Sequence, residues 1–134
     1  MIETTYTLEP VALVRHRVTG QVDRQQAAEG AAQALDLVQQ LAGAHGPIAL
    51  VLDLRRHQFM DLQAHRTWSE GFARNPALGG RVRAVAIVGD DTPAFQAERE
   101  LMQSERVRFF AGLAEAERWL AQTDAPDRNK RNAN

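Results

Sequence analysis

The chain has 134 residues, a formal net charge of -1 at pH 7 and no cysteine. This length fits one domain, and the near-neutral charge gives no field that would gather nucleic acid or an acidic membrane. Without cysteine there is no disulfide framework, thiolate nucleophile or thiolate zinc site. We expect a soluble, cytoplasmic protein without a membrane-inserted segment, with one domain over residues 1–122 and a flexible tail over residues 123–134.

The first two predicted elements are strands that form an antiparallel hairpin. Residues 11–18 alternate between two faces, and His16 falls on the same face as Val14 and Val18. Residues 2–8 are rich in threonine and other strand formers, and the short link that follows suits a hairpin. The outer edge of residues 2–8 would lack a partner strand, and such an edge can recruit a second copy of the chain into a homodimer.

A helix is predicted from Asp23, a suitable N-cap, to Gly43 and the Gly46–Pro47 pair, which end it. Its apolar residues recur at helical spacing, and they are Ala27, Ala31, Ala34, Leu35, Val38, Leu41 and Ala42. Residues 48–54 are apolar except for Asp53, and residues 82–88 are similar apart from Arg83. Continuous apolar runs of this length are typical of central parallel strands covered on both faces.

Three further helices and one strand complete the predicted order. The first helix begins near Asp61, the next opens with Thr92 and Pro93, and the last follows a short strand at residues 107–110. Helices between successive strands imply right-handed crossovers and a mainly parallel sheet. The sequence therefore predicts an α/β sandwich with about five strands, an N-terminal antiparallel hairpin and four helices.

Three residues have a spacing that could suit a metal site. His57, Asp61 and His65 are spaced by four residues, which on one continuous helix would align three potential ligands. Asp61, however, stands where an N-cap belongs, so His57 would lie in the loop before the helix. We therefore predict neither a metal site nor any other cofactor.

Charged residues follow both central strands of the predicted sheet. They are Asp53, Arg55, Arg56 and His57 after the first strand, and Asp90 and Asp91 after the second. Loops at the carboxyl ends of parallel strands share one end of the sheet, where ligands of such folds bind. Paired carboxylates could perform acid–base chemistry there, whereas in the simpler interpretation the aspartates cap turns and the arginines are solvated or pair with them. No phosphate loop and no nucleophile with a partnered base is present, so we predict no catalytic residue.

The stretch from residue 48 to residue 68 resembles the STAS domain, which anti-sigma factor antagonists and sulfate transporter tails share. In that family a strand enters a helix through a pattern similar to D-L-S-x-x-x-x-x-D-S-S-G. Asp53 with Leu54 and, eight residues later, Asp61 stand at the matching places, and Phe59 with Met60 forms the apolar pair before the second aspartate. The segments RVRAVAIVGDD, ERVRFF and AERWL are similar to the second half of the SpoIIAA-like branch.

The chain departs from this resemblance at the regulatory positions. In signalling members the serine after the second aspartate is phosphorylated, and the added charge at the helix N-terminus switches partner binding. Leu62 occupies that position here, followed by Gln63 and Ala64. The resemblance therefore implies the fold without the serine switch.

Two classes of function are favoured, and an enzyme with a site at the carboxyl end of the sheet ranks third. The first is a regulatory module that docks a protein partner through Asp61, Leu62 and the neighbouring loop at residues 55–58. The second is a carrier of a small apolar ligand or lipid, because the SpoIIAA-like branch is also similar in outline to CRAL-TRIO carriers. Trp68 is most simply a core residue, but its ring could also line a carrier's pocket. A carrier would need a cavity of about 300 to 1,000 Å³ between this helix and the sheet.

Overall fold

The computed structural model describes residues 1–59, 62–73, 80–90 and 92–122. The elements in these residues are β1 (Ile2–Thr7), β2 (Leu13–Val22), α1 (Arg24–His45), β3 (Ile48–Phe59), α2 (Leu62–Ala73), β4 (Val82–Val88), α3 (Pro93–Met102), β5 (Val107–Phe110) and α4 (Leu113–Gln122). The strands lie in the order β1-β2-β3-β4-β5, with β1 antiparallel to β2 and every other pair parallel. The predicted α/β sandwich is confirmed. The tail predicted at residues 123–134 lies outside the described residues.

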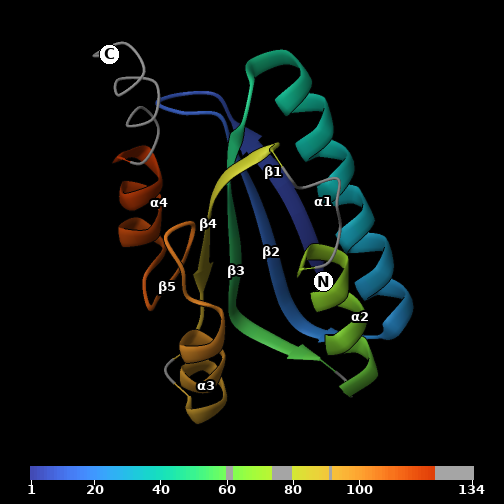
Figure 1. Cartoon of the computed structure of the whole chain (residues 1–134). Helices are drawn as coiled ribbons and strands as arrows, with labels where there is room; N and C mark the ends of the chain where they lie inside the picture. Colours follow the sequence, from blue (N-terminus) through green and yellow to red (C-terminus); the bar gives the residue numbers. More distant parts are fainter. Residues whose placement is uncertain (60–61, 74–79, 91, 123–134) are drawn as a thin grey trace.

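Helices cover both faces of the sheet, with α1 and α2 on one side and α4 on the other (Figure 1). On the first side, Leu50 and Leu52 of β3 pack in one buried cluster with residues of both helices. On the second side, Ala49 and Val51 of the same strand pack with Leu120 of α4. Because residues 48–52 of β3 are buried on both faces, this part of the strand is continuously apolar instead of alternating. No helix in the described residues is long and apolar enough to cross a membrane.

Two helix starts follow the predicted capping chemistry. The carboxylate of Asp23 accepts a 2.8 Å hydrogen bond from the backbone N–H of Gln26, and the Gln26 side chain accepts one of 3.0 Å in return. This reciprocal capping box satisfies two backbone donors at the start of α1. Thr92 caps α3 by accepting a 3.1 Å bond from the N–H of Phe95. The cap predicted at Asp61 lies outside the described residues.

Strand β3 is longer than predicted, and the prediction of a loop at residues 55–58 is wrong. These residues continue β3, because β2 also continues past Gly20 and supplies a pairing partner as far as Val22. Gly20 has φ 67°, a conformation that glycine adopts without strain. The sequence did not indicate this extension. In β3, Arg, His and Gln side chains interrupt the apolar pattern, and in β2 the glycine resembles a turn residue.

The two helices on the first face approach closely at Gly71 of α2. A methyl group added there would lie 2.8 Å from the Cβ atom of Ala31 on α1, whereas one added at Gly43 of α1 would meet nothing within 4 Å. We expect Gly71→Ala to lower the free energy of unfolding by about 1 to 2 kcal/mol, because the helices must separate. Gly43→Ala, the matched control, should raise it by about 0.5 to 1 kcal/mol through helix propensity. Urea denaturation would check both, and a Gly71→Ala protein as stable as Gly43→Ala would contradict the close approach.

Candidate functional site

A bulge in the middle of β3, beside the carboxyl end of β4, shapes the candidate site. Between Arg17 and Thr19, a single residue of β2 faces two residues of β3, Leu54 and Arg55. The extra residue in a bulge leaves backbone groups without a partner in the ladder. The side chain of Asp53 meets this need, since its Oδ1 atom accepts a 3.3 Å hydrogen bond from the backbone N–H of Arg55. The bulge thus brings the side chains of Asp53 and Arg55 together.

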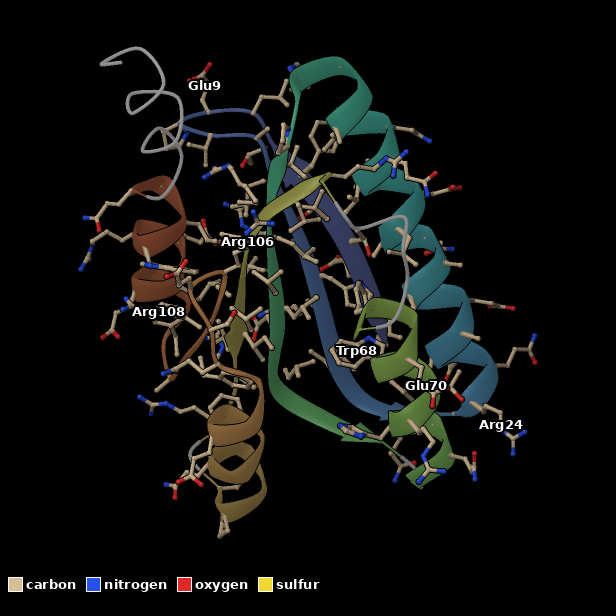
Figure 2. All side chains as sticks on the ribbon, in the orientation of Figure 1. Glu9, Arg24, Trp68, Glu70, Arg106 and Arg108 are labelled. Atoms are coloured by element: carbon tan, nitrogen blue, oxygen red, sulfur yellow. The ribbon has the colours of Figure 1, made fainter. Side chains whose placement is uncertain are left out.

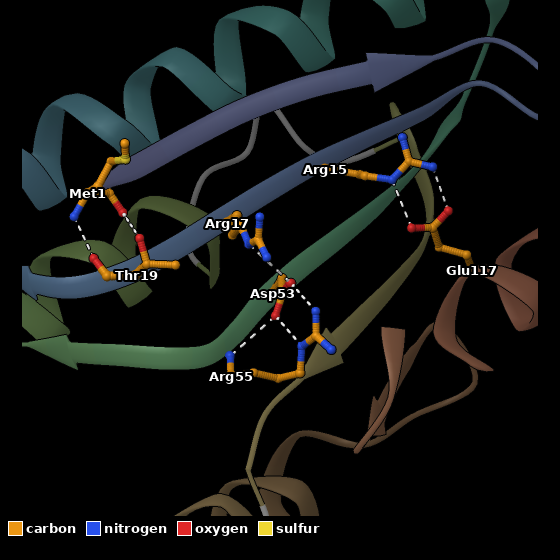
Figure 3. A network of polar contacts seen from close by, with 7 residues as sticks. All are labelled: Met1, Arg15, Arg17, Thr19, Asp53, Arg55 and Glu117. Atoms are coloured by element: carbon orange, nitrogen blue, oxygen red, sulfur yellow. Dashed lines mark hydrogen bonds and ion pairs between the residues drawn. The ribbon is translucent and has the colours of Figure 1, made fainter. Parts of the chain in front are cut away.

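The carboxylate of Asp53 is held by the guanidinium of Arg55 (Figure 3). Two hydrogen bonds of 2.9 Å join Nε to Oδ1 and Nη2 to Oδ2, and the Nε atom of Arg17 lies 3.8 Å from Oδ2. Burial alone would raise the pKa of Asp53, but the hydrogen bonds from Arg55 and the two positive charges together lower it below its usual value. The hydrogen bond to Asp53 also raises the pKa of Arg55. The group is therefore a fixed ion pair with Arg17 beside it.

These three side chains line a polar pocket of about 260 Å³ together with Thr19 and Asp90. Asp90 is exposed and follows β4 after one glycine. Asp53, Arg55 and Asp90 therefore meet at the carboxyl end of β4, as their sequence positions predict, while β2 and β3 continue past the pocket to Val22 and Phe59. The sequence did not identify Arg17 or Thr19. Arg17 is recognised from the register of β2 on β3, which places it opposite Asp53.

The other candidate site residues are distributed over separate elements. Arg56 and His57 lie on β3, Leu62 is the first residue of α2, and Asp61 and Asp91 lie outside the described residues. His57 pairs with Gly20 of β2, so it belongs to the sheet, whereas His65 belongs to a helix. Within the described ranges, no group of three or more His, Asp or Glu residues could hold a metal ion.

Trp68 lies in the core between α2 and the sheet (Figure 2), with 4% of its surface exposed. Its indole N–H donates a 2.9 Å hydrogen bond to Nε2 of His16, and the two rings stack with centroids 5.8 Å apart. The ring of Phe72 lies 5.0 Å from each of them. Aromatic side chains thus occupy the space around Trp68, in the region where an apolar carrier would need its cavity.

His16 is fully buried on β2 and connects three elements. Because Nε2 accepts the hydrogen bond from Trp68, Nδ1 is the protonated nitrogen and donates to the hydroxyl of Thr4 on β1, at 3.1 Å. Burial lowers the pKa of His16 to about 4, so the ring is neutral near pH 7. The sequence placed His16 on the buried face of its strand but did not pair it with Trp68, which is 52 residues away.

Arg15 lies on the same face of β2 as Arg17, opposite to that of His16, and its side chain contacts α4 (Figure 3). Its guanidinium donates two hydrogen bonds to the carboxylate of Glu117 on α4, and the bond from Nε is 2.8 Å long. This bidentate contact raises the pKa of Arg15. Arg15 thus has a structural partner, whereas the side chain of Arg17 is 51% exposed.

Comparisons with known proteins agree with this architecture. A sequence comparison with curated proteins found no match. An uncharacterised protein with a SpoIIAA-like fold from Shewanella loihica is 16% identical, with a TM-score of 0.60 over 90% of this chain and 92% of that chain. The phosphorylated form of the Bacillus cell fate determinant SpoIIAA is 14% identical, with a TM-score of 0.56 over 89% of this chain and 98% of that chain.

The anti-sigma factor antagonist SpoIIAA in its unphosphorylated form is 12% identical, with a TM-score of 0.53 over 89% of this chain and 94% of that chain. At these identities the solved structures show a common fold. The SpoIIAA-like family model matches residues 13–121, which include β2 and every later element. On this match the chain belongs to the SpoIIAA-like family.

Proposed function

We propose that this protein is a non-catalytic module that docks a protein partner at the carboxyl end of its parallel strands. The main support is the fixed charge pattern there, in which Asp53 holds Arg55 beside the exposed side chains of Arg17 and Asp90. A charged group that is already ordered loses less side-chain entropy when a partner binds. Charges arranged at an interface mainly govern partner choice and the rate of association.

The state of Asp53 favours docking over catalysis. A general acid or base works best when its pKa lies near the working pH. The pKa of Asp53 is instead lowered, and both of its carboxylate oxygens accept hydrogen bonds from Arg55. This carboxylate stabilises the bulge in β3 and is poorly suited to transferring protons.

The packing around Trp68 favours docking over the carriage of an apolar ligand. His16 and Phe72 contact Trp68 directly, so a ligand would have to displace core side chains to enter beside it. The pocket at the carboxyl end is lined mainly by charged side chains and measures about 260 Å³. Carrier cavities are largely apolar and measure about 300 to 1,000 Å³.

Docking in this proposal does not depend on a serine switch. The first three residues of α2 are Leu62, Gln63 and Ala64, none of which has a hydroxyl group. Gln63 is exposed and Ala64 is fully buried. Partner binding is therefore constitutive with respect to phosphorylation at these positions.

The test compares two charge reversals that change the net charge equally. Asp90→Lys alters the exposed residue at the pocket, and Asp36→Lys, the control, alters an exposed residue of α1. Partners captured on the wild-type chain would be identified by mass spectrometry, purified and titrated by calorimetry. We expect Asp90→Lys to weaken the complex by about tenfold or more and Asp36→Lys to change it by less than about twofold, because only the first charge lies at the interface.

Three results would contradict docking at this end of the sheet. The first is an equal effect of the two reversals on every purified partner. The second is an apolar ligand retained by the freshly purified protein in native mass spectrometry. The third is turnover of a phosphoester, acyl ester or glycoside that is lost in Asp53→Asn.

A further inference from the structure

Strand β1 forms one edge of the sheet, and it has little of the protection that edge strands usually have. Its sequence, IETTYT, contains one charged residue, Glu3, and neither lysine nor proline. In the described part of the chain, the exposed large apolar side chains are Met1, Tyr6 and Leu8, at 70%, 51% and 43% exposure, and all lie on β1 or next to its ends. An unprotected edge with exposed apolar side chains is suited to pairing with another strand.

The hydrogen bonds of β1 show which backbone groups face outward. Met1 and Thr19 exchange both backbone bonds, and the one from Thr19 N–H to the Met1 carbonyl is 2.8 Å long. In an antiparallel pair such residues alternate along the strand, so Glu3 and Thr5 also point their backbone groups toward β2. The N–H and C=O groups of the residues between them, at positions 2, 4 and 6, therefore point away from the sheet.

We infer that a second copy of the chain pairs with this edge, antiparallel and about a two-fold axis at Thr4. In this register the outward backbone N–H and C=O groups of Ile2 form hydrogen bonds with those of Tyr6 of the partner subunit. Those of Thr4 form hydrogen bonds with the same groups of the partner's Thr4. Aromatic residues opposite β-branched ones, and threonine opposite threonine, are favourable cross-strand pairs. Glu3 faces the partner's Thr5, so the two negative charges do not meet. The two five-stranded sheets then form one continuous sheet.

This self-association is independent of the docking proposal. It uses the lateral edge at β1, whereas the candidate site lies at the carboxyl end of β4, beside the middle of β2 and β3. A dimer leaves both copies of that site outside the paired strands. The experiments on Asp90 and those on β1 can therefore fail separately.

Sedimentation equilibrium of the full chain tests whether β1 is the interface. Tyr6→Pro removes an outward N–H that β2 does not use, so proline is tolerated in the monomer but interrupts pairing with the second copy. We expect the wild type to dimerise and Tyr6→Pro to weaken the dimer by about tenfold or more. Glu115→Ala, an exposed change on α4 and away from β1, is the control and should leave the dimer unchanged. Tyr6→Lys keeps the N–H and adds an edge charge, and it replaces the proline variant if that variant does not fold.

Disulfide cross-linking tests the register, since the chain has no cysteine of its own. Glu3→Cys combined with Thr5→Cys places the new thiols directly opposite each other across the axis, with Cα atoms about 4.5 Å apart, which a disulfide can bridge. In either single variant the thiols lie diagonally, more than about 7 Å apart, which a disulfide cannot bridge. We expect covalent dimers from the double variant and not from the single ones.

Each of three results would overturn the inference. One is a wild type that stays monomeric up to about 100 µM. Another is a dimer that neither Tyr6→Pro nor Tyr6→Lys weakens, because its interface would then lie elsewhere. The last is equal cross-linking of the single and double cysteine variants, which would exclude the axis at Thr4.

Discussion

Replacing Arg55 by methionine is expected to lower the free energy of unfolding by about 1 to 3 kcal/mol, between the cost of losing an exposed ion pair and that of breaking a buried one, because the Arg55 side chain is 33% exposed. The Asp53 side chain is 7% exposed and accepts both of its side-chain hydrogen bonds from Arg55. Without the guanidinium, a charged carboxylate stays in a desolvated position. The guanidinium borders the pocket, so entering water limits the loss. Urea denaturation at pH 7 measures the change.

Arg17→Met is the matched control for this prediction. Its guanidinium lies 3.8 Å from Asp53 and its side chain is 51% exposed, so its loss should cost about 0 to 1 kcal/mol. Asp53→Asn added to Arg55→Met should recover part of the lost stability, because a neutral amide is less costly to bury than an unpaired carboxylate. Equal losses from Arg17→Met and Arg55→Met would refute the role assigned to the Asp53–Arg55 pair.

Lowering the pH from 7 to 4 is expected to remove about 3 kcal/mol of stability through His16 alone. Burial lowers its pKa from an ordinary 6.5 to about 4 in the folded chain. Between these two values the unfolded state binds the proton and the folded state does not, so stability falls as the pH falls. The stability contributed by His16 is complete above about pH 6.5 and is lost progressively down to about pH 4. Each unit by which the pKa of the folded chain lies below that of the unfolded chain corresponds to about 1.4 kcal/mol.

His16→Gln separates this titration from that of other groups. A glutamine oxygen can accept the hydrogen bond from Trp68, but the side chain does not titrate. The variant should be less stable than the wild type at pH 7, and the difference between the two proteins should shrink as the pH approaches 4. Urea denaturation followed by tryptophan fluorescence gives both curves. A stability difference that stays constant from pH 7 to pH 4 would show that His16 keeps an ordinary pKa in the folded chain.

Local sequence patterns were sufficient to predict the fold. The continuous apolar run of β3 specified a strand covered on both faces, because each of its side chains contacts one of two helical layers. Asp23 and Thr92 identified helix starts, because capping involves residues only two or three positions apart. Parallel strands share their carboxyl ends, which is why Asp53, Arg55 and Asp90 could be grouped before the structure was known.

The remainder of the site depends on register and long-range contact, which local patterns do not encode. The bulge at Leu54 and Arg55 exists only relative to β2, so the sequence ended the strand too early. The bond between His16 and Trp68 needs a helix and a strand to be packed before it can form. The cap expected at Asp61 lies outside the described residues and stays a prediction.

Amide chemical shift mapping tests the central claim most directly. The isotopically labelled chain would be titrated with its purified partner, and shifts would be followed for every assigned residue. Docking at the carboxyl end of the sheet predicts changes centred on Arg17, Thr19, Arg55 and Asp90, with the solvent-facing side of α1 unaffected. Changes centred on α1 or α4, with these four residues unmoved, would contradict it.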